Sequence, residues 1–272
     1  MNSDILTSED CISVLDRGLA YGDGLFETFR VRQGRPCLWQ EHMARLQNGC
    51  DRLDIPRPDL QLLEKEAIEL CAGVADGVLK LIFTRGTGGR GYRIPDTPIP
   101  WHGFSLHPAP TYPDRFKNEG IGARICQTRL GRNPALAGIK HLNRLEQVLA
   151  RKEWSDEFQE GLMLDVDAQV IEGTMSNLFL ITKHGLLTPA LTECGIEGVM
   201  RSRILEWAEG EGIPCDLRSN IRLEDVFSAD SLFFTNSVIG VWPVRQLEDM
   251  NYSLDNEILQ QLLREEDEIC AD

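Results

Sequence analysis

Lys140 has the neighbours of a lysine that could react with a carbonyl group. It lies in the stretch LAGIKHLN, between Ile139 and Leu142, where a loop passes into a predicted helix. Apolar surroundings disfavour a charged ammonium and lower its pKa, which frees the amine to form a Schiff base. A solvated lysine at a helix start is the alternative, and this lysine alone does not decide between the two.

Two further segments could complete a site around such a lysine. Glu172, in VIEGTMSNLFLI, lies between apolar segments and next to Gly173. A buried carboxylate needs a cationic partner, such as a protonated pyridine nitrogen, although a carboxylate that caps a turn is the alternative. The stretch CGIEGVMRSRIL predicts a helix start, and the backbone N–H groups of a helix start suit a phosphate.

A glycine-rich loop follows the predicted strand Leu79–Phe83, and its glycines at positions 86, 88 and 91 match the letters of a dinucleotide-binding loop. That kind of loop opens a helix that holds a pyrophosphate. Three prolines within residues 95–100 exclude a helix here, so the match is accidental. The alternatives are a flexible surface turn or a loop that clamps an anionic ligand. Its candidate side chains are Arg85, Arg90, Tyr92 and Arg93.

Composition limits the class of ligand. The 272 residues carry a net charge of −15, and a surface of that sign repels nucleic acid and anionic membranes. No run of apolar residues is long enough for a membrane span, and the first ten residues lack a secretory pattern, so a cytoplasmic location is expected. The 8 cysteines and 5 histidines are scattered, which predicts free thiols and no metal site.

The predicted elements come in mixed order rather than in strict strand–helix alternation, which indicates an α+β fold. Strands are predicted on both sides of a turn near residue 34, followed by helices over 40–55 and 58–74. Proline crowds residues 108–113, which predicts a linker and two domains, 1–112 and 113–272. The second half predicts a strand at 122–130, helices over 138–154, 196–213 and 254–268, a hairpin turning at 167–169 and paired strands within 231–244.

Several motifs, taken together and in order, resemble the fold-type IV enzymes that use pyridoxal 5'-phosphate (PLP). They are DRGLAYGDGLFETFRV, HMARL, GIKHLNRLEQVLAR, EGTMSNLFLI and GIEGVMR. The family includes branched-chain aminotransferases, D-amino-acid aminotransferases and 4-amino-4-deoxychorismate lyases, and the stretch LGRNPALAGIKHLNRLEQVL with TRGTGGRGY is most similar to the lyases. The resemblance implies a smaller N-terminal α/β sandwich, a larger C-terminal β-barrel-like domain with flanking helices, PLP between them, and a homodimer.

The resemblance also implies roles for individual residues. Lys140 would form the Schiff base with PLP and act as the catalytic base, and Glu172 would pair with the pyridinium nitrogen. The cofactor phosphate would be bound by Arg45, Val199, Met200 and Ser237. The substrate would be bound by Arg90, Tyr92, Tyr21 and Phe26. Thr28 would assist proton transfer, since a threonine at this point resembles the lyase.

The implied reaction converts 4-amino-4-deoxychorismate to 4-aminobenzoate and pyruvate in folate synthesis. An aminotransferase of the same family, acting on D-amino acids or branched-chain substrates, is the nearest alternative. Leu79 stands where the branched-chain enzymes have an arginine, which argues against branched-chain substrates. A non-catalytic binding protein that has kept the fold is a more distant alternative, and the presence of Lys140, Glu172 and Arg45 argues against it.

Overall fold

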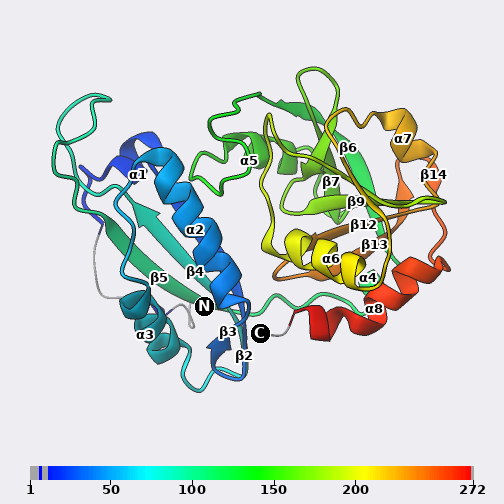
Figure 1. The fold of residues 1–272 in the computed structure, drawn as a ribbon, viewed down its shortest axis with the longest axis horizontal. Coiled ribbons are helices and arrows are strands. Elements are labelled where there is room, and N and C mark those ends of the chain that lie inside the picture. Colours follow the sequence, from blue (N-terminus) through cyan, green and yellow to red (C-terminus); the bar gives the residue numbers. More distant parts are fainter. Residues whose placement is uncertain (1–5, 8–11, 271–272) are drawn as a thin grey trace. The chain divides into compact units, whose positions relative to one another are not determined.

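The computed structural model describes residues 6–7 and 12–270. Cys11 and most of the first ten residues, on which the expectation of no secretory signal rests, lie outside these ranges. The chain forms two compact units, both drawn in Figure 1. The first comprises the described residues up to Thr111 together with Ile139–Asn143, and the second comprises Tyr112–Gly138 and the residues from Arg144 onward. The mixed α+β class predicted from the sequence is confirmed.

The first unit is built on an antiparallel five-stranded sheet with the strand order β1-β5-β4-β2-β3. Its central pair, β2 and β4, runs in unbroken register from Gly24 opposite Thr84 to Arg32 opposite Asp76. The elements are β1 (Leu6–Thr7), α1 (Arg17–Tyr21), β2 (Gly24–Arg32), β3 (Arg35–Pro36), α2 (Trp39–Leu53), α3 (Leu60–Cys71), β4 (Asp76–Thr84) and β5 (Trp101–Pro108).

Helix α2 covers one face of this sheet, as Figure 1 shows. Along β2, Leu25, Phe29 and Val31 are buried, because side chains of a strand alternate between its two faces. A Cβ atom at Gly49 of α2 would lie 2.7 Å from the Leu25 side chain. The glycine therefore lets the helix backbone approach the strand closely.

Helix α3 begins later than the sequence predicts. Asp59 is its N-cap, and the Asp59 carboxylate accepts hydrogen bonds from the N–H groups of Gln61 and Leu62 at 3.0 and 3.2 Å. Pro58 therefore precedes the cap rather than occupying the first turn. The prediction of a helix from residue 58 was wrong by two positions, because the capping carboxylate defines the start.

The second unit contains a nine-stranded sheet whose main path has the order β11-β10-β9-β12-β13-β6-β7-β8, with β14 paired to β13. Strand β8 ends this path, yet a turn of three residues, 174–176, leads from it directly into β9 near the other end. The sheet therefore curls back toward itself, in agreement with the barrel-like domain expected. The strands are β6 (Ile121–Leu130), β7 (Glu160–Asp165), β8 (Val170–Gly173), β9 (Asn177–Thr182), β10 (Gly185–Pro189), β11 (Cys215–Arg218), β12 (Ser231–Asn236), β13 (Gly240–Leu247) and β14 (Met250–Asn251).

Both faces of the sheet are buried at β9, which explains the continuous apolar stretch LFLI, residues 178–181, within this strand. Leu178 and Leu180 belong to the core cluster that also contains Trp242, whereas Phe179 and Ile181 pack in a second cluster with two helices. A strand buried on both faces is expected to be apolar throughout rather than alternating. The helices of this unit are α4 (Arg115–Asn118), α5 (Leu145–Arg151), α6 (Val199–Gly210), α7 (Leu223–Phe227) and α8 (Glu257–Ile269), of which α6 and α8 cover β9.

Helix α5 is shorter than the helix predicted over 138–154, and three of its apolar side chains are exposed. It begins at Leu145, so Leu142 lies before it and outside the helix. Leu145, Val148 and Leu149 are 76%, 61% and 54% exposed, so their stripe contributes little to the core of this chain. An exposed apolar patch of this kind marks a candidate surface for another protein.

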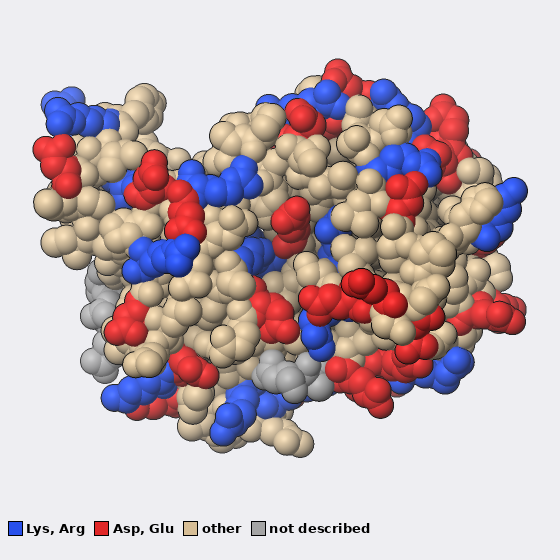
Figure 2. Space-filling view, viewed as in Figure 1, with Lys and Arg blue, Asp and Glu red and all other residues tan. Residues whose placement is uncertain are grey.

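The surface carries charges of both signs. Figure 2 shows acidic and basic side chains interspersed over the face in view. None of the described helices combines the length and apolar character needed to cross a membrane. Within residues 6–7 and 12–270, no group of three or more His, Cys, Asp or Glu side chains is arranged to hold a metal ion.

Candidate active site

Lys140 is anchored to strand β2 of the first unit. The Phe26 N–H donates to the Lys140 carbonyl at 3.0 Å, and the Leu142 N–H donates to the Gly24 carbonyl at 3.0 Å. The Lys140 ammonium nitrogen lies 4.4 Å from the centre of the Phe26 ring. The backbone hydrogen bonds fix the position of Lys140. The Phe26 ring excludes water from one side of the ammonium group and interacts favourably with its positive charge.

Phe26 and Thr28 share a face of β2, because they are two residues apart in a strand. Thr28 is paired in register with Lys80 of β4, and the Lys80 ammonium lies 5.4 Å from the Phe26 ring. The first unit therefore brings Lys80 and Lys140 to the same aromatic ring. Lys80 was not predicted as a site residue. The available signal was the alternation of β4, which places Lys80 on the strand face opposite the buried Leu79 and Leu81.

On the opposite face of β2, a buried network fixes Arg45 of α2. The Arg45 guanidinium donates from Nε to Glu27 Oε1 at 2.9 Å and from Nη2 to Glu27 Oε2 at 2.5 Å, and His42 Nδ1 lies 2.7 Å from Glu27 Oε2. Burial raises the pKa of Glu27, but Arg45 and His42 outweigh it and bring that pKa to about 2. The ionised carboxylate of Glu27 therefore fixes the orientation of the Arg45 guanidinium.

His42 connects this network to Lys140 through charge. Burial lowers the pKa of His42, the Glu27 carboxylate raises it, and the charges of Arg45 and Lys140 lower it again, with a net decrease. His42 is completely buried, so at neutral pH the imidazole is in its uncharged form. Neither Glu27 nor His42 was predicted from the sequence.

In the second unit, Glu172 lies near the end of β8 and is 4% exposed. Its Oε2 accepts a hydrogen bond from the Ile196 N–H at 2.8 Å. Arg144 lies within range of its negative charge: burial lowers the pKa of Arg144, and the Glu172 carboxylate opposes that change. Glu172 is thus a buried carboxylate near a cationic side chain, Arg144, that was not predicted from the sequence.

Helix α6 begins at Val199 and Met200, close to the segment that binds Glu172. Its N-cap is Gly198, where a Cβ atom would lie 2.0 Å from Asn177 Oδ1. Asn177 also donates from Nδ2 to the Ile196 carbonyl at 2.8 Å. The first N–H groups of a helix have no acceptor within the helix, so this start presents donors and a positive dipole end suited to a phosphate.

Ser237 lies in the turn between β12 and β13. The preceding residue, Asn236, accepts from the N–H groups of Val238 and Ile239 at 2.8 and 2.9 Å, and donates to the Met175 carbonyl at 2.9 Å. This turn is thereby held against the β8–β9 turn that follows Glu172. The second unit therefore brings three predicted segments together, those of Glu172, Val199–Met200 and Ser237.

Three of the four candidate side chains of the glycine-rich loop, Arg90, Tyr92 and Arg93, are exposed. The fourth, Arg85, is 3% exposed and donates to Asp23 and to the carbonyls of Leu53 and Asp54, so the prediction that it faces a ligand was wrong. Tyr92 is 83% exposed, Arg90 is also exposed, and Tyr21 packs against Tyr92 with ring centres 5.3 Å apart. No helix follows Gly91 before β5 begins. The structure therefore excludes a dinucleotide-binding loop of the kind that the glycine spacing suggests.

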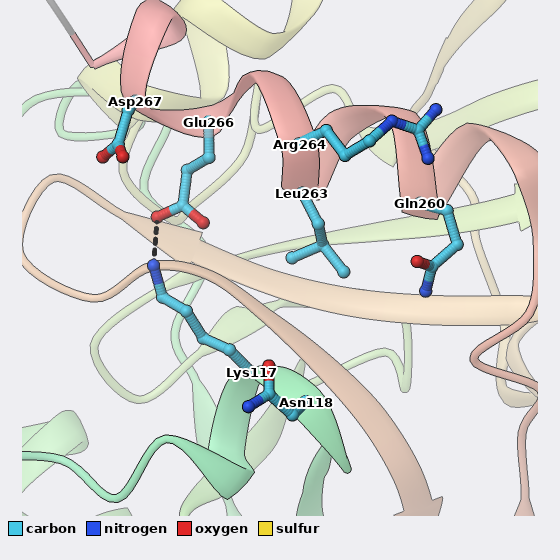
Figure 3. Close-up of a pocket in the computed structure, with 7 residues that line it drawn as sticks. All are labelled: Lys117, Asn118, Gln260, Leu263, Arg264, Glu266 and Asp267. Atoms are coloured by element: carbon cyan, nitrogen blue, oxygen red, sulfur yellow. Dashed lines mark hydrogen bonds and ion pairs between the residues drawn. The ribbon is translucent and has the colours of Figure 1, made fainter.

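One cavity in the second unit lies away from these residues. It has a volume of about 310 Å³ and lies between α4 and α8, where Lys117 donates to Glu266 at 2.7 Å (Figure 3). Both signs of charge line it, and none of the predicted site residues does. Its lining residues are Lys117, Asn118, Gln260, Leu263, Arg264, Glu266 and Asp267.

Comparison with known proteins identifies the family. The family model described as amino-transferase class IV matches residues 24–247. The chain belongs to the class IV aminotransferase family. The match covers every residue selected above for chemistry except Tyr21, and the family resemblance predicted from the sequence motifs is confirmed.

Within the class IV family, the chain is similar to lyases and to aminotransferases. The aminodeoxychorismate lyase of Vibrio harveyi is 35% identical over 241 residues, which cover 88% of this chain and 89% of that protein. The putative branched-chain-amino-acid aminotransferase of Methanocaldococcus jannaschii is 29% identical over 91% of this chain and 87% of its own length. The crystal structure of 4-amino-4-deoxychorismate lyase from Pseudomonas aeruginosa superimposes with a TM-score of 0.89 at 47% identity, covering 96% of this chain and 98% of that one.

Proposed function

We propose that the protein is a PLP-dependent lyase that converts 4-amino-4-deoxychorismate to 4-aminobenzoate and pyruvate, a step of folate synthesis. The observation that carries the proposal is the likeness of almost the whole chain to lyases of this name, at 35% identity to the Vibrio harveyi protein and 47% to the Pseudomonas aeruginosa structure. The aminodeoxychorismate lyase of Bacillus subtilis is similar as well, at 28% identity over 93% of this chain.

The donor groups of the two units fit the chemistry of PLP. The first unit supplies an amine, Lys140, and an arginine fixed by a carboxylate, Arg45. The second supplies a buried carboxylate, Glu172, and the start of α6. An aldehyde needs the amine, a pyridinium nitrogen needs the carboxylate, and a phosphate needs the arginine and the helix start.

In this proposal, residues far apart in the sequence would hold the cofactor. Lys140 would hold the cofactor through its amine, and Glu172 would pair with the ring nitrogen. Arg45, the N–H groups of Val199 and Met200 at the start of α6, and the Ser237 hydroxyl would hold the phosphate. When bound, PLP supplies an electron sink for the carbanion that forms next to the substrate nitrogen.

The substrate-binding residues of the proposal lie in the first unit. Arg90 and Tyr92 bind a substrate carboxylate, for which a guanidinium and a hydroxyl are suitable donors. Tyr21 and Phe26 line the pocket, and the Phe26 ring already contacts the Lys140 ammonium. A substrate with two carboxylates suits an arginine-bearing loop in a chain with an overall charge of −15.

Lys140 and Thr28 carry the proton transfers. Lys140 removes the proton from the substrate carbon that bears the amino group, and Glu172 keeps the ring nitrogen protonated. The C–O bond at the neighbouring carbon breaks, and the remaining ring becomes aromatic, which favours the products. Thr28 relays a proton from Lys140 to the methylene carbon of the departing enolpyruvate, which becomes pyruvate.

An aminotransferase is the second candidate, because relatives of that name also match most of the chain. The D-alanine aminotransferase of Bacillus licheniformis is 25% identical over 89% of this chain. The lyases at 35% and 47% identity exceed both this value and the 29% of the Methanocaldococcus jannaschii aminotransferase, so the lyase is favoured. Assays for 4-aminobenzoate and for amino exchange with 2-oxo acids separate the two, and exchange without 4-aminobenzoate would reject the lyase.

The active form is a cytoplasmic homodimer in this proposal. The exposed stripe of Leu145, Val148 and Leu149 on α5 supports self-association, because contiguous apolar surface is costly to leave in water. The overall negative charge argues against nucleic acid and anionic membranes as partners.

Replacement of Lys140 tests the site. Lys140→Ala should remove both the visible absorption of the PLP Schiff base and the formation of 4-aminobenzoate, while the circular dichroism spectrum stays unchanged. Lys65→Ala is the matched control, since Lys65 is 71% exposed on α3 and forms only a loose pair with Glu69 at 3.9 Å. Retention of the absorption band and of turnover in Lys140→Ala would show that the site is assigned wrongly.

A further inference from the structure

We propose that Arg17 is a positioning residue that holds the glycine-rich loop, residues 86–95, in the conformation that presents Arg90 and Tyr92 to the substrate. The substrate part of this inference rests on the proposed function. The loop is exposed and lacks regular structure apart from a single bridge between Thr87 and Asp16, so some other interaction must define its shape. Arg17 supplies that interaction from the start of α1.

The Arg17 guanidinium binds three consecutive carbonyl groups of the loop. Nη1 donates to the carbonyls of Gly91 and Arg93 at 3.1 and 3.3 Å, and Nη2 donates to the carbonyl of Tyr92 at 3.2 Å. Arg17 itself is 4% exposed, although the loop that it binds lies at the surface. Hydrogen bonds from a charged donor are stronger than those between neutral groups, and burial protects them from water.

The orientation of Arg17 is fixed from its other side. Its Nε donates to Asp23 Oδ2 at 2.7 Å, and Asp23 is itself bound by Arg85 at 2.8 and 3.0 Å. Burial raises the pKa of Asp23, but Arg85 and Arg17 outweigh it and lower that pKa below its ordinary value. The carboxylate therefore stays ionised at neutral pH and holds the guanidinium toward the loop.

Tyr21 adds a second attachment. The Arg17 guanidinium lies 5.1 Å from the centre of the Tyr21 ring, and the Tyr21 hydroxyl accepts a hydrogen bond from the Gly91 N–H at 3.3 Å. The Tyr21 ring also packs edge-on against Tyr92. Arg17 and Tyr21 together bind both the N–H and the carbonyl of Gly91, which defines the direction of the chain at the position between Arg90 and Tyr92.

The glycines of the loop allow this wrapping. A Cβ atom at Gly88 would lie 2.8 Å from Arg17 Cδ, so the loop passes directly over the arginine stem. Gly91 has a φ of +85°, which permits its carbonyl to turn toward the guanidinium at no steric cost. The spacing that imitates a dinucleotide-binding loop thus serves to enclose an arginine side chain.

Arg17 binds only main-chain atoms of the loop, which leaves the loop's side chains available for other groups. Tyr92 is 83% exposed and Arg90 is exposed as well. A lysine could replace the charge of Arg17, but it is a single point donor and cannot reproduce the planar fork that reaches three carbonyls and Asp23. This difference makes Arg17→Lys a test of geometry at constant charge.

Hydrogen–deuterium exchange of the PLP-loaded protein without substrate tests the attachment itself. In Arg17→Lys, amides of residues 86–94 should exchange about tenfold faster, because the loop opens more often once the fork is lost. Gly88→Ala should act in the same direction by displacing the arginine stem. Gly89→Ala is the matched control, since a Cβ atom there would have no neighbour within 4 Å, and its exchange should equal that of the wild type.

Steady-state kinetics tests the link to substrate. Arg17→Lys and Gly88→Ala should raise KM about fivefold or more and change kcat by less than about twofold, because a mobile loop weakens binding of substrate and transition state alike. Gly89→Ala should leave both constants unchanged. Hydrogen–deuterium exchange is measured without substrate, so its result stands even if the protein proves to be an aminotransferase. In that case the same KM comparison is made with the aminotransferase substrates.

Two results would overturn the inference. Unchanged exchange over residues 86–94 in both Arg17→Lys and Gly88→Ala would show that Arg17 does not hold the loop. Faster exchange with an unchanged KM would show that the loop is held by Arg17 but does not position the substrate. A merely structural role of Arg17 would instead lower kcat and thermal stability together, with KM unaffected.

Discussion

Glu27 shows how a single buried carboxylate can govern both stability and the orientation of a binding residue. It is 1% exposed, and its two oxygens are bound by Arg45 and His42. Removing the charge from one member of such a network leaves the other charge without its partner. The effect on Arg45 should therefore be larger than the loss of one hydrogen bond.

The pH dependence of stability provides the first prediction. The pKa of Glu27 falls from its ordinary value of 4.5 to about 2 in the folded chain. A lowered carboxyl pKa contributes stability that is complete above the unfolded pKa and is lost as the pH falls through the folded pKa. Glu27→Gln should therefore lower the free energy of unfolding by about 3 kcal/mol at pH 7, and the difference from wild type should shrink between pH 4.5 and 2.

Urea unfolding at several pH values measures this difference. Glu69→Gln is the control, because Glu69 is 66% exposed and its pair with Lys65 at 3.9 Å is open to solvent, so little change is expected at any pH. An unfolding free energy of Glu27→Gln equal to that of wild type at pH 7 would refute the proposed role of the network.

The turn between β8 and β9 depends on one carboxylate of the neighbouring strand β7. Glu160 is completely buried and accepts hydrogen bonds from the N–H groups of Gly161, Thr174 and Met175 at 2.8, 3.0 and 3.4 Å. The hydroxyls of Thr174 and Ser176 donate to it at 2.5 and 2.6 Å. Five donors around one carboxylate fix the turn that follows Glu172.

Glu160→Gln should loosen this turn, because the amide replaces one accepting oxygen with a donor that faces other donors. We expect the free energy of unfolding to fall by about 2 kcal/mol or more, as for a buried group left without a partner. Thermal or urea unfolding measures it, with the exposed Glu268→Gln of α8 as the control. Equal stability of the two variants would mean that the turn does not need the carboxylate.

Sequence patterns predict most of these elements and fewer of their contacts. The hairpin turning at 167–169 and the paired strands within 231–244 follow from turn residues between apolar segments, which act locally. Glu27 was missed because an acid in a strand usually faces water, although its two-residue spacing from Leu25 and Phe29 places it on the buried face. The pairing of Lys140 with β2 links residues more than 100 positions apart, and no local pattern encodes such a contact.

At the scale of the whole molecule, the exposed stripe of α5 predicts the assembly state. Val148→Glu with Leu149→Glu should place two charges on the stripe and convert the proposed homodimer into monomers of 30.7 kDa, as measured by analytical ultracentrifugation. Leu62→Glu is the control, since Leu62 is 45% exposed on α3 of the other unit. A double variant that keeps the mass of the wild-type species would exclude α5 as the dimer surface.

Residues Ile139–Asn143 belong to the first unit although they lie within the sequence of the second, and this limits where the gene could be cut or recombined. A gene fragment that ends near residue 112 would encode a sheet without the segment that accepts from the Phe26 N–H and donates to the Gly24 carbonyl. Such a fragment would carry an exposed strand edge, which is prone to aggregation. Recombination between homologous genes near residue 112 should therefore yield functional hybrids only when residues 24–26 and 139–143 are mutually compatible, whichever parent supplies each.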